Sequence, residues 1–124
     1  MPPPITILLP VYNAEAYLPA CLDSIWRQQQ PPASVLAIDD GSTDASAAIL
    51  AAHAKEHPAL MVLRNDTNQG LVRTLNRGLH EIKSPWVARL DADDLAVPSR
   101  LARQWETVQS DNRIGLCYSD YTVI

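Results

Sequence analysis

The chain has 124 residues, of which 47% are hydrophobic, and its formal net charge is −4. This length suits one domain with its own core, and the negative charge argues against nucleic acid as a partner. No apolar run approaches the roughly 20 residues of a membrane-spanning helix. Cys21 and Cys117 are not spaced like metal ligands. Two isolated thiols without a signal-peptide pattern lead us to expect a cytoplasmic protein, with a place at the inner face of the membrane left open.

Short apolar runs alternate with helical patterns along the chain. The runs predict strands at residues 5–9, 35–38, 60–63, 86–90 and 114–118. Helices are predicted at residues 17–29, 44–56, 71–82 and 98–108, with Thr43 or Asp44 as cap of the second and Pro98 in the first turn of the fourth. This alternation predicts an α/β fold over residues 1–124: one three-layer α/β/α domain with a mostly parallel, doubly wound sheet.

The third predicted helix has an unusual pattern. Leu71, Leu75 and Leu79, with Val72 and Ile82, predict an amphipathic helix whose apolar face covers the sheet. Helical propensity does not explain Gly78 near its end. The histidines have the spacing of exposed helix residues, and we assign none of them to a metal: His53, His57 and His80.

Four loops follow the first four predicted strands, at residues 10–13, 39–43, 65–70 and 91–94. In a parallel sheet such loops meet at one edge, and ligands bind there. Two of these loops carry clusters of acids, which favours a ligand site over unrelated turns. For residues 39–40 the alternative is turn chemistry before Gly41, and for residues 65–70 we prefer a loop-shaping role.

The acids Asp91, Asp93 and Asp94 follow the fourth predicted strand within four positions. Their mutual repulsion is relieved by a hard divalent ion, Mg²⁺ or Mn²⁺, held by one or two carboxylates, water and phosphate oxygens. The alternative is a solvated turn in which Asp94 caps the next helix. We also expect Arg89 to pair with an acid near this site.

The sequence lacks the glycine-rich motifs of dinucleotide and P-loop phosphate sites, and its acids do not form a calcium loop. What remains is a cleft that holds a base and a sugar by acids and an aromatic ring, with a metal bridging phosphates. That is the requirement of a nucleoside diphosphate bound with Mg²⁺ or Mn²⁺.

These residues resemble the nucleotide-binding half of the family 2 glycosyltransferases, which have the GT-A fold. The resemblance covers nearly all of residues 5–105. The matching stretches, in the order and spacing of the family, are ITILLPVYNAEAYLPACLDSIWRQ, VLAIDDGSTDAS, LRNDTNQGLVRTLNRGL and WVARLDADDLAVPSRL. Together they are a specific signal, although each one alone is weak.

The resemblance implies a nucleotide-binding role for residues of two loops and one helix. Pro10 and Tyr12 would line a uracil pocket, with Tyr12 stacking on the base. Asp39 or Asp40 would accept a hydrogen bond from the base, and we favour Asp40. Arg73 would lie near the base or the diphosphate, although a solvated helix position is an equal alternative.

The resemblance also implies roles for the acids after the fourth strand. Asp91 would approach the ribose or a metal-bound water, Asp93 would ligate the ion directly, and Asp94 would share the metal or cap the next helix. The ion would stabilise charge on the departing diphosphate while an acceptor hydroxyl attacks with inversion. The implied donor is a UDP-sugar, and the implied acceptor is a glycan, a lipid-linked molecule or a protein in cell wall or polysaccharide biosynthesis.

The family places its general base beyond the fifth strand, and this sequence stops at Ile124. We therefore expect a donor-binding fragment that transfers sugar poorly, with the catalytic residue unknown and with self-association through an exposed apolar edge. A non-catalytic sugar-nucleotide-binding or interaction module is the alternative from another class. A nucleotidyltransferase is weaker still, because residues 10–14 contain no Lys or Arg.

Overall fold

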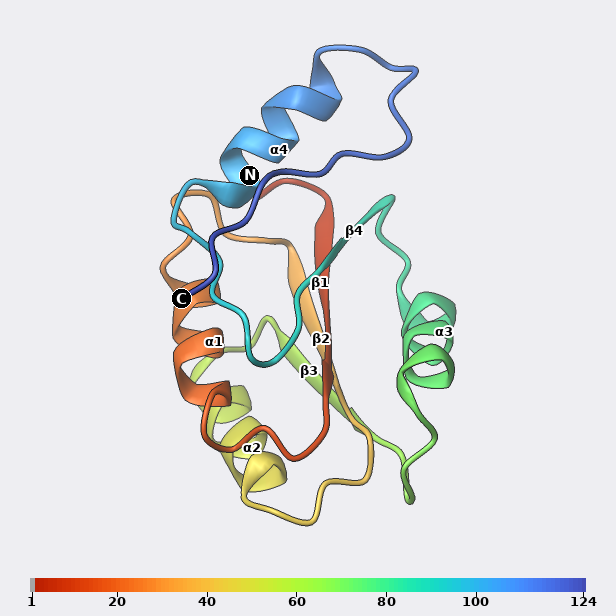
Figure 1. Ribbon diagram of the computed structural model, residues 1–124. Helices are drawn as coiled ribbons and strands as arrows, with labels where there is room; N and C mark the ends of the chain where they lie inside the picture. The colour runs from red at the N-terminus through yellow and green to blue at the C-terminus, as the bar shows by residue number, and fades with distance from the viewer. Residues whose placement is uncertain (1) are drawn as a thin grey trace.

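A computed structural model describes residues 2–124 (Figure 1). Four parallel strands form one sheet in the order β3-β2-β1-β4. The strands are β1 (Ile5–Val11), β2 (Ser34–Asp39), β3 (Leu60–Arg64) and β4 (Trp86–Arg89). The predicted parallel α/β sheet is confirmed for these strands, and their carboxyl ends all lie at the same edge.

Helices cover both faces of the sheet (Figure 1). They are α1 (Leu18–Trp26), α2 (Ser46–Glu56), α3 (Leu71–Glu81) and α4 (Arg100–Gln109). In Figure 1, α1 and α2 lie on one side of the sheet and α3 lies on the other. None of the helices within residues 2–124 combines the length and the apolar character needed to cross a membrane.

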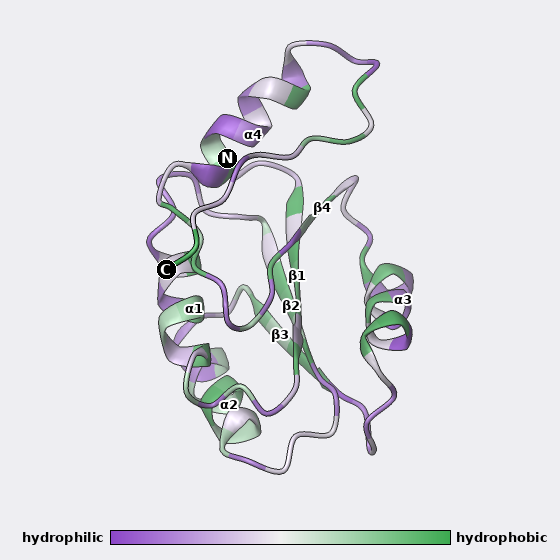
Figure 2. Ribbon diagram, in the orientation of Figure 1, coloured by the Kyte–Doolittle hydropathy of each residue, from purple (hydrophilic) through white to green (hydrophobic). Residues whose placement is uncertain are grey.

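Strand β1 is apolar except for Thr6, which is typical of a strand with both faces covered. Ile7 and Leu9 belong to the larger core on the α1 side, whereas Leu8 belongs to a smaller core with Leu36 and Ile38 beneath α3. Figure 2 shows this contrast: the strands are largely hydrophobic, and the loops that leave their carboxyl ends are mostly hydrophilic.

The ends of the helices differ from the predicted ends by up to three residues. Helix α1 begins at Leu18, one residue after the predicted start at 17, and ends at Trp26, three residues before the predicted end at 29. Asp44 Oδ1 accepts the Ser46 N–H at 2.9 Å, but the N-cap residue of α2 is Ala45, so the prediction of Thr43 or Asp44 as the cap is wrong. Helix α4 begins at Arg100, later than the prediction from Pro98.

The predicted face of α3 is wrong in part. Leu71 and Leu79 are 52% and 54% exposed, whereas Thr74 and Gly78 are buried against the sheet. A Cβ atom on Gly78 would lie 3.0 Å from Leu8 Cδ2 and closer still to its Cδ1. The glycine therefore allows the close approach of helix and sheet that propensity could not explain.

The predicted fifth strand at residues 114–118 is wrong. The chain after α4 is irregular, and Leu116 and Tyr118 are 81% and 86% exposed. A strand forms only with a hydrogen-bonded neighbour, and within residues 2–124 the edge strand β4 pairs with β1 alone. The apolar pattern of this segment therefore has no partner in the described chain.

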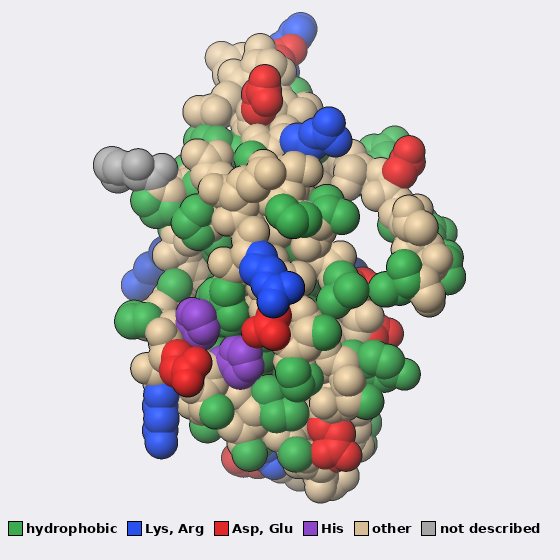
Figure 3. All heavy atoms as spheres, turned by 90° about the vertical axis from the view of Figure 1, so that its left-hand side faces the viewer, with side chains coloured by type: hydrophobic (Ala, Val, Ile, Leu, Met, Phe, Trp, Pro, Cys, Tyr) green, Lys and Arg blue, Asp and Glu red, His purple; other side chains and the backbone are tan. Residues whose placement is uncertain are grey.

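The histidines of α2 and its end are not the exposed residues that we expected. His53 and His57 are partly buried beside Trp26. Trp26 Nε1–H donates to His53 Nδ1 at 3.1 Å, and the His57 ring stacks on Trp26 with centroids 3.9 Å apart. Histidine side chains reach the surface on the α1–α2 side of the molecule (Figure 3). Their role here is aromatic packing.

Candidate functional site

The loops after β1 and β2 form one unit at the carboxyl edge of the sheet. Asn13 N–H donates to Ser42 Oγ at 2.9 Å, and Asn13 Oδ1 accepts the Thr43 N–H at 2.8 Å. Asn13 has a φ of 46°, a left-handed conformation that asparagine tolerates better than most residues. Ala14 N–H donates to Ser46 Oγ at 3.0 Å. These bonds hold the loop that carries Tyr12 against the start of α2.

Asp40 follows β2 and is only 4% exposed. Its Oδ1 accepts Asn65 Nδ2–H at 2.9 Å and Gln69 N–H at 2.7 Å, and its Oδ2 accepts Gly70 N–H at 3.0 Å. Burial acts to raise the pKa of Asp40, but these hydrogen bonds outweigh burial and lower the pKa below its ordinary value. Asp40 is therefore an ionised carboxylate that organises the loop after β3.

Asp39 has a different role from the one we considered for it. Its carboxylate is buried, forms an ion pair with Arg64 and accepts the Ser42 N–H at 3.0 Å. Asp39 is absent from the residues that line the pocket described below. Of the two candidates for the base contact, only the favoured Asp40 lies at that pocket.

Gly41 lets two loops approach closely. Its φ is +75°, and a Cβ atom there would lie 2.8 Å from Asn68 N and 2.8 Å from the Thr67 carbonyl carbon. Both the conformation and the space therefore require glycine at this position. The turn chemistry that was the alternative for residues 39–41 is present, and it coexists with a pocket.

The segment that directly follows the acid turn, residues 91–94, is held by two polar side chains, one on α1 and one two residues after its end. Ser24 Oγ accepts the Ala96 N–H at 3.0 Å, and the buried Gln28 donates from Nε2 to the Val97 carbonyl at 2.8 Å. These bonds attach the segment that follows the acid turn to a helix of the core. Neither spacing nor composition predicts this role for Ser24 and Gln28.

The acid turn carries a concentration of negative charge. Burial, followed by the charges of Asp93 and Asp91, raises the pKa of Asp94. Burial, followed by the charges of all three acids, raises the pKa of the Cys21 thiol to about 12. Arg89 offsets part of this charge through the predicted ion pair with Asp91, at 2.8 Å. A bound cation would relieve the remaining repulsion.

The donor atoms of the acid turn fit a hard divalent ion that is shared with a ligand. Asp93 and Asp94 are exposed, and Asp91 is half-buried. Within residues 2–124, no three His, Cys, Asp or Glu side chains converge to hold a metal by themselves. An ion at this turn would therefore need oxygens from water or a phosphate, which is typical of Mg²⁺ sites.

A pocket of about 250 Å³ opens between these loops. It is lined by Pro10, Val11, Tyr12, Asp40, Asn68, Gly70, Leu71, Thr74 and Asp91. Tyr12 is 49% exposed, so one face of its ring is available to a ligand. We call this cavity the Tyr12 pocket. Four of the residues predicted for nucleotide binding meet here, from the end of β1 and from the loops after β1, β2 and β4.

The sequence reasoning missed part of this lining. Asn68 and Gly70 were expected only to shape their loop, and Leu71 and Thr74 were not considered for the site. Thr74 Oγ1 accepts a hydrogen bond from Asn65 Nδ2 at 3.1 Å, which links the first turn of α3 to the loop. These residues follow the third strand at the edge where the other loops meet, and this position could have indicated a place in the pocket.

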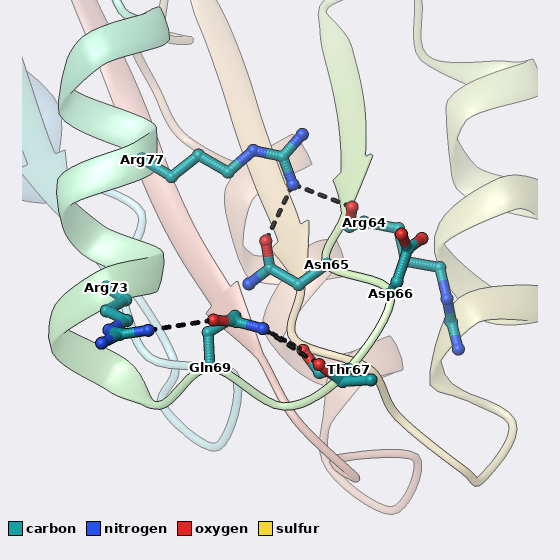
Figure 4. A pocket seen from close by; sticks show the side chains of 7 residues that line it. All are labelled: Arg64, Asn65, Asp66, Thr67, Gln69, Arg73 and Arg77. Atoms are coloured by element: carbon teal, nitrogen blue, oxygen red, sulfur yellow. Dashed lines mark hydrogen bonds between the residues drawn. The ribbon is translucent and has the colours of Figure 1, made fainter.

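Arg73 does not line the Tyr12 pocket. Its side chain borders a second pocket of about 560 Å³ on the other side of the loop, with Arg64 and Arg77 (Figure 4). Arg73 Nη1 donates to Gln69 Oε1 at 3.4 Å. The structure thus separates Arg73 from the other residues predicted to bind the nucleotide.

The profile of glycosyl transferase family 2 matches residues 6–123. The chain belongs to this family. It is 30% identical over 115 residues to the putative glycosyltransferase EpsH of Bacillus subtilis, covering 93% of this chain and 33% of EpsH. It is 34% identical over 119 residues to a PGL/p-HBAD biosynthesis glycosyltransferase of Mycobacterium bovis, covering 95% of this chain and 46% of the relative.

Solved structures give the same assignment of the fold. S. aureus TarS 1–349 in complex with UDP-GlcNAc superposes with a TM-score of 0.79 at 26% identity, covering 89% of this chain and 32% of TarS 1–349. The mannosyltransferase PcManGT of Pyrobaculum calidifontis, in complex with GDP-Man and Mn²⁺, has a TM-score of 0.79 at 27% identity, covering 87% of this chain and 33% of PcManGT. The fold is the GT-A fold that the resemblance implied, and the chain spans between a third and a half of these proteins.

Proposed function

We propose that this chain is the donor-binding part of a glycosyltransferase. It binds a UDP-sugar with Mg²⁺ or Mn²⁺ for transfer of the sugar to an acceptor hydroxyl with inversion. The observation that carries the proposal is that Pro10, Tyr12, Asp40 and Asp91 line one pocket in a member of family 2. TarS with UDP-GlcNAc and PcManGT with GDP-Man and Mn²⁺ support a nucleotide-sugar donor.

The Tyr12 pocket suits a base and a ribose. The half-exposed ring of Tyr12 offers a stacking surface, and the pyrrolidine ring of Pro10 adds an apolar wall. Asp40 is held ionised, so one of its oxygens can accept a hydrogen bond from an imide N–H of uracil. Asp91 lies at the same pocket and is close to the ribose in this arrangement.

Asp93, with Asp91 or Asp94, would hold the divalent ion at the acid turn. When bound, the ion supplies Lewis-acid stabilisation of the charge that develops on the departing diphosphate. The chain sets the position of this turn, because Ser24 on α1 and Gln28 just after α1 hold the segment that follows it.

We assign no general base within residues 2–124. The acids that line the Tyr12 pocket in this part of the chain are Asp40 and Asp91, and both serve the donor in this proposal. The proposed acceptor is a glycan, a lipid-linked molecule or a protein, and the proposed location is cytoplasmic, including the inner face of the membrane. The chain alone is expected to bind nucleotide but to transfer sugar poorly.

Isothermal titration calorimetry with UDP and GDP, each with and without Mn²⁺, tests the proposal. We expect UDP to bind more tightly with Mn²⁺, and the metal effect to disappear in Asp93→Ala. Asp120→Asn is the matched control, because Asp120 is an exposed acid outside the site. Tighter binding of GDP than of UDP would show that the pocket selects guanine and not the proposed uracil.

Two other outcomes would reject the donor site. UDP binding that is indifferent to metal and to Asp93→Ala would indicate a binding module without transfer chemistry. Absence of saturable binding of either nucleotide by the folded protein would remove the site altogether. Pyrophosphate release from CTP or ATP would instead indicate a nucleotidyltransferase.

A further inference from the structure

The larger pocket lies across the residue 65–70 loop from the Tyr12 pocket. It has a volume of about 560 Å³ and is lined by Arg64, Asn65, Asp66, Thr67, Gln69, Arg73 and Arg77 (Figure 4). We call it the arginine pocket. Its three arginines come from the end of β3 and from α3, and nothing in the proposed donor site uses them.

Arg73 and Arg77 are four positions apart on α3, so they lie on the same face of the helix. Like charges at this spacing destabilise a helix slightly. Within residues 2–124, neither arginine has an ion pair with a carboxylate, whereas Arg64 is paired with the buried Asp39. The one acidic residue that lines the pocket, Asp66, lies on the Arg64 side of the loop, away from Arg73 (Figure 4).

Arg77 is oriented by neutral oxygens. Its Nη1 donates to the Arg64 carbonyl and to Asn65 Oδ1, each at 2.8 Å. These two bonds fix the plane of the guanidinium and, in the described part of the chain, leave its Nε–H and Nη2–H groups without a protein acceptor. A planar guanidinium with free N–H groups matches the oxygens of a phosphate.

We propose that the arginine pocket binds a phosphate-type oxyanion through Arg73 and Arg77. The negative charge of such a group would offset the repulsion between Arg73 and Arg77. Its oxygens would accept hydrogen bonds from the N–H groups that have no acceptor in the described part of the chain. The source is either a phosphate ester on a larger molecule or a free inorganic anion. The inference does not depend on the Tyr12 pocket being a donor site.

The two pockets are linked through the residues that hold Asp40. Arg77 contacts Asn65, and Arg73 contacts Gln69. Asn65 Nδ2–H and Gln69 N–H are two of the three donors to the Asp40 carboxylate. An anion that orders both arginines therefore restrains the loop on which the Tyr12 pocket depends.

Nuclear magnetic resonance of the ¹⁵N-labelled chain, titrated with pyrophosphate in EDTA and without nucleotide, tests the site. We expect saturable shifts at the Nε–H groups of Arg73 and Arg77 and slower hydrogen exchange at the Gln69 amide. Arg73→Gln should weaken pyrophosphate binding about tenfold, the effect of one charge-assisted hydrogen bond. Arg103→Gln is the matched control, because Arg103 is exposed on α4.

Arg77→Lys is used because complete removal of the Arg77 side chain could loosen the loop. Lysine keeps the positive charge but lacks the planar guanidinium. We expect weaker binding in this variant with an unchanged spectrum elsewhere. Methyl phosphate bound as tightly as inorganic phosphate would indicate an esterified phosphate, and clear preference for the inorganic anion would indicate a free one. Shifts confined to the Tyr12 pocket, or unchanged binding in Arg73→Gln, would overturn the inference. Neither result would affect the UDP titration.

Discussion

Asp40→Asn tests the link between a buried carboxylate and the loop that forms the Tyr12 pocket. The carboxylate accepts three hydrogen bonds at 2.7–3.0 Å, from Asn65, Gln69 and Gly70. In the variant, the amide oxygen can serve Asn65 and Gln69, but the amide N–H then meets the Gly70 N–H. One bond is replaced by two facing donors, and the other two bonds lose the help of a negative charge.

The expected cost is about 3 kcal/mol. Hydrogen bonds to a charged group contribute about 1.5–3 kcal/mol each, and a buried N–H left without an acceptor costs about 1–3 kcal/mol. For a domain of this size, 1 kcal/mol corresponds to roughly 4 °C in Tm, so Asp40→Asn should lower Tm by about 10 °C. UDP affinity should fall as well, because the loop that lines the pocket is no longer held.

The pH dependence of stability gives a second readout. The pKa of Asp40 is lower in the folded chain than its ordinary value of about 3.9. The unfolded chain therefore binds the proton more readily, and the contribution of Asp40 is fully present only above about pH 5. That contribution is lost as the pH falls through the lowered, folded-state pKa. Asp40→Asn should show a smaller loss of stability between pH 5 and pH 3.

Urea denaturation followed by tryptophan fluorescence measures both effects. Asp23→Asn is the control, since Asp23 is an exposed acid on α1. We expect Asp23→Asn to behave like the unaltered chain at every pH. A midpoint for Asp40→Asn within experimental error of this control, with the same decline in acid, would show that the carboxylate does not hold the loop.

Three further predictions follow from other contacts. Gly41→Ala should lower the free energy of unfolding by at least about 2 kcal/mol, because φ is +75° and the Cβ would lie 2.8 Å from Asn68 N. Gly115→Ala is the control in the same urea series and should be neutral, because the space around Gly115 is open. Gln28→Ala should cost about 2 kcal/mol, because Gln28 donates to the Val97 carbonyl after the acid turn and accepts the Leu101 N–H at 3.1 Å. The variant should also weaken Mn²⁺-dependent UDP binding, measured by calorimetry. Unchanged affinity would show that Gln28 does not position the acid turn. The apolar side chains of Leu116 and Ile124 are 81% and 94% exposed, so we expect the chain to self-associate as its concentration rises. Sedimentation velocity measures this, and a monomer at all concentrations would contradict the prediction.

Hydrophobic pattern was sufficient for the framework. The continuous apolar run of β1 predicts a strand covered on both faces, and the alternation of runs and helical patterns predicts parallel pairing. Because parallel strands have their carboxyl ends at one edge, the sequence also predicted that Tyr12, Asp40 and Asp91 would meet, and they line one pocket.

The hydrophobic pattern does not predict which of two possible neighbours a polar side chain contacts. Asp39 and Asp40 are adjacent acids, and their side chains point in opposite directions from the end of β2, one to Arg64 and one to the loop after β3. Arg73 has the spacing of a pocket residue, but its position on α3 takes it to the other side of the loop. These directions depend on how α3 and the loops are placed on the sheet.

The order of strands and helices, the edge where a ligand binds and the family were determined by the sequence, because apolar periodicity and loop chemistry are local properties. Three features were decided only by the tertiary structure. Gly78 allows α3 to approach Leu8, Asp39 is neutralised by Arg64, and residues 114–118 remain irregular without a neighbouring strand. Each depends on a partner distant in sequence, and neither propensity nor periodicity contains information about which distant groups come into contact.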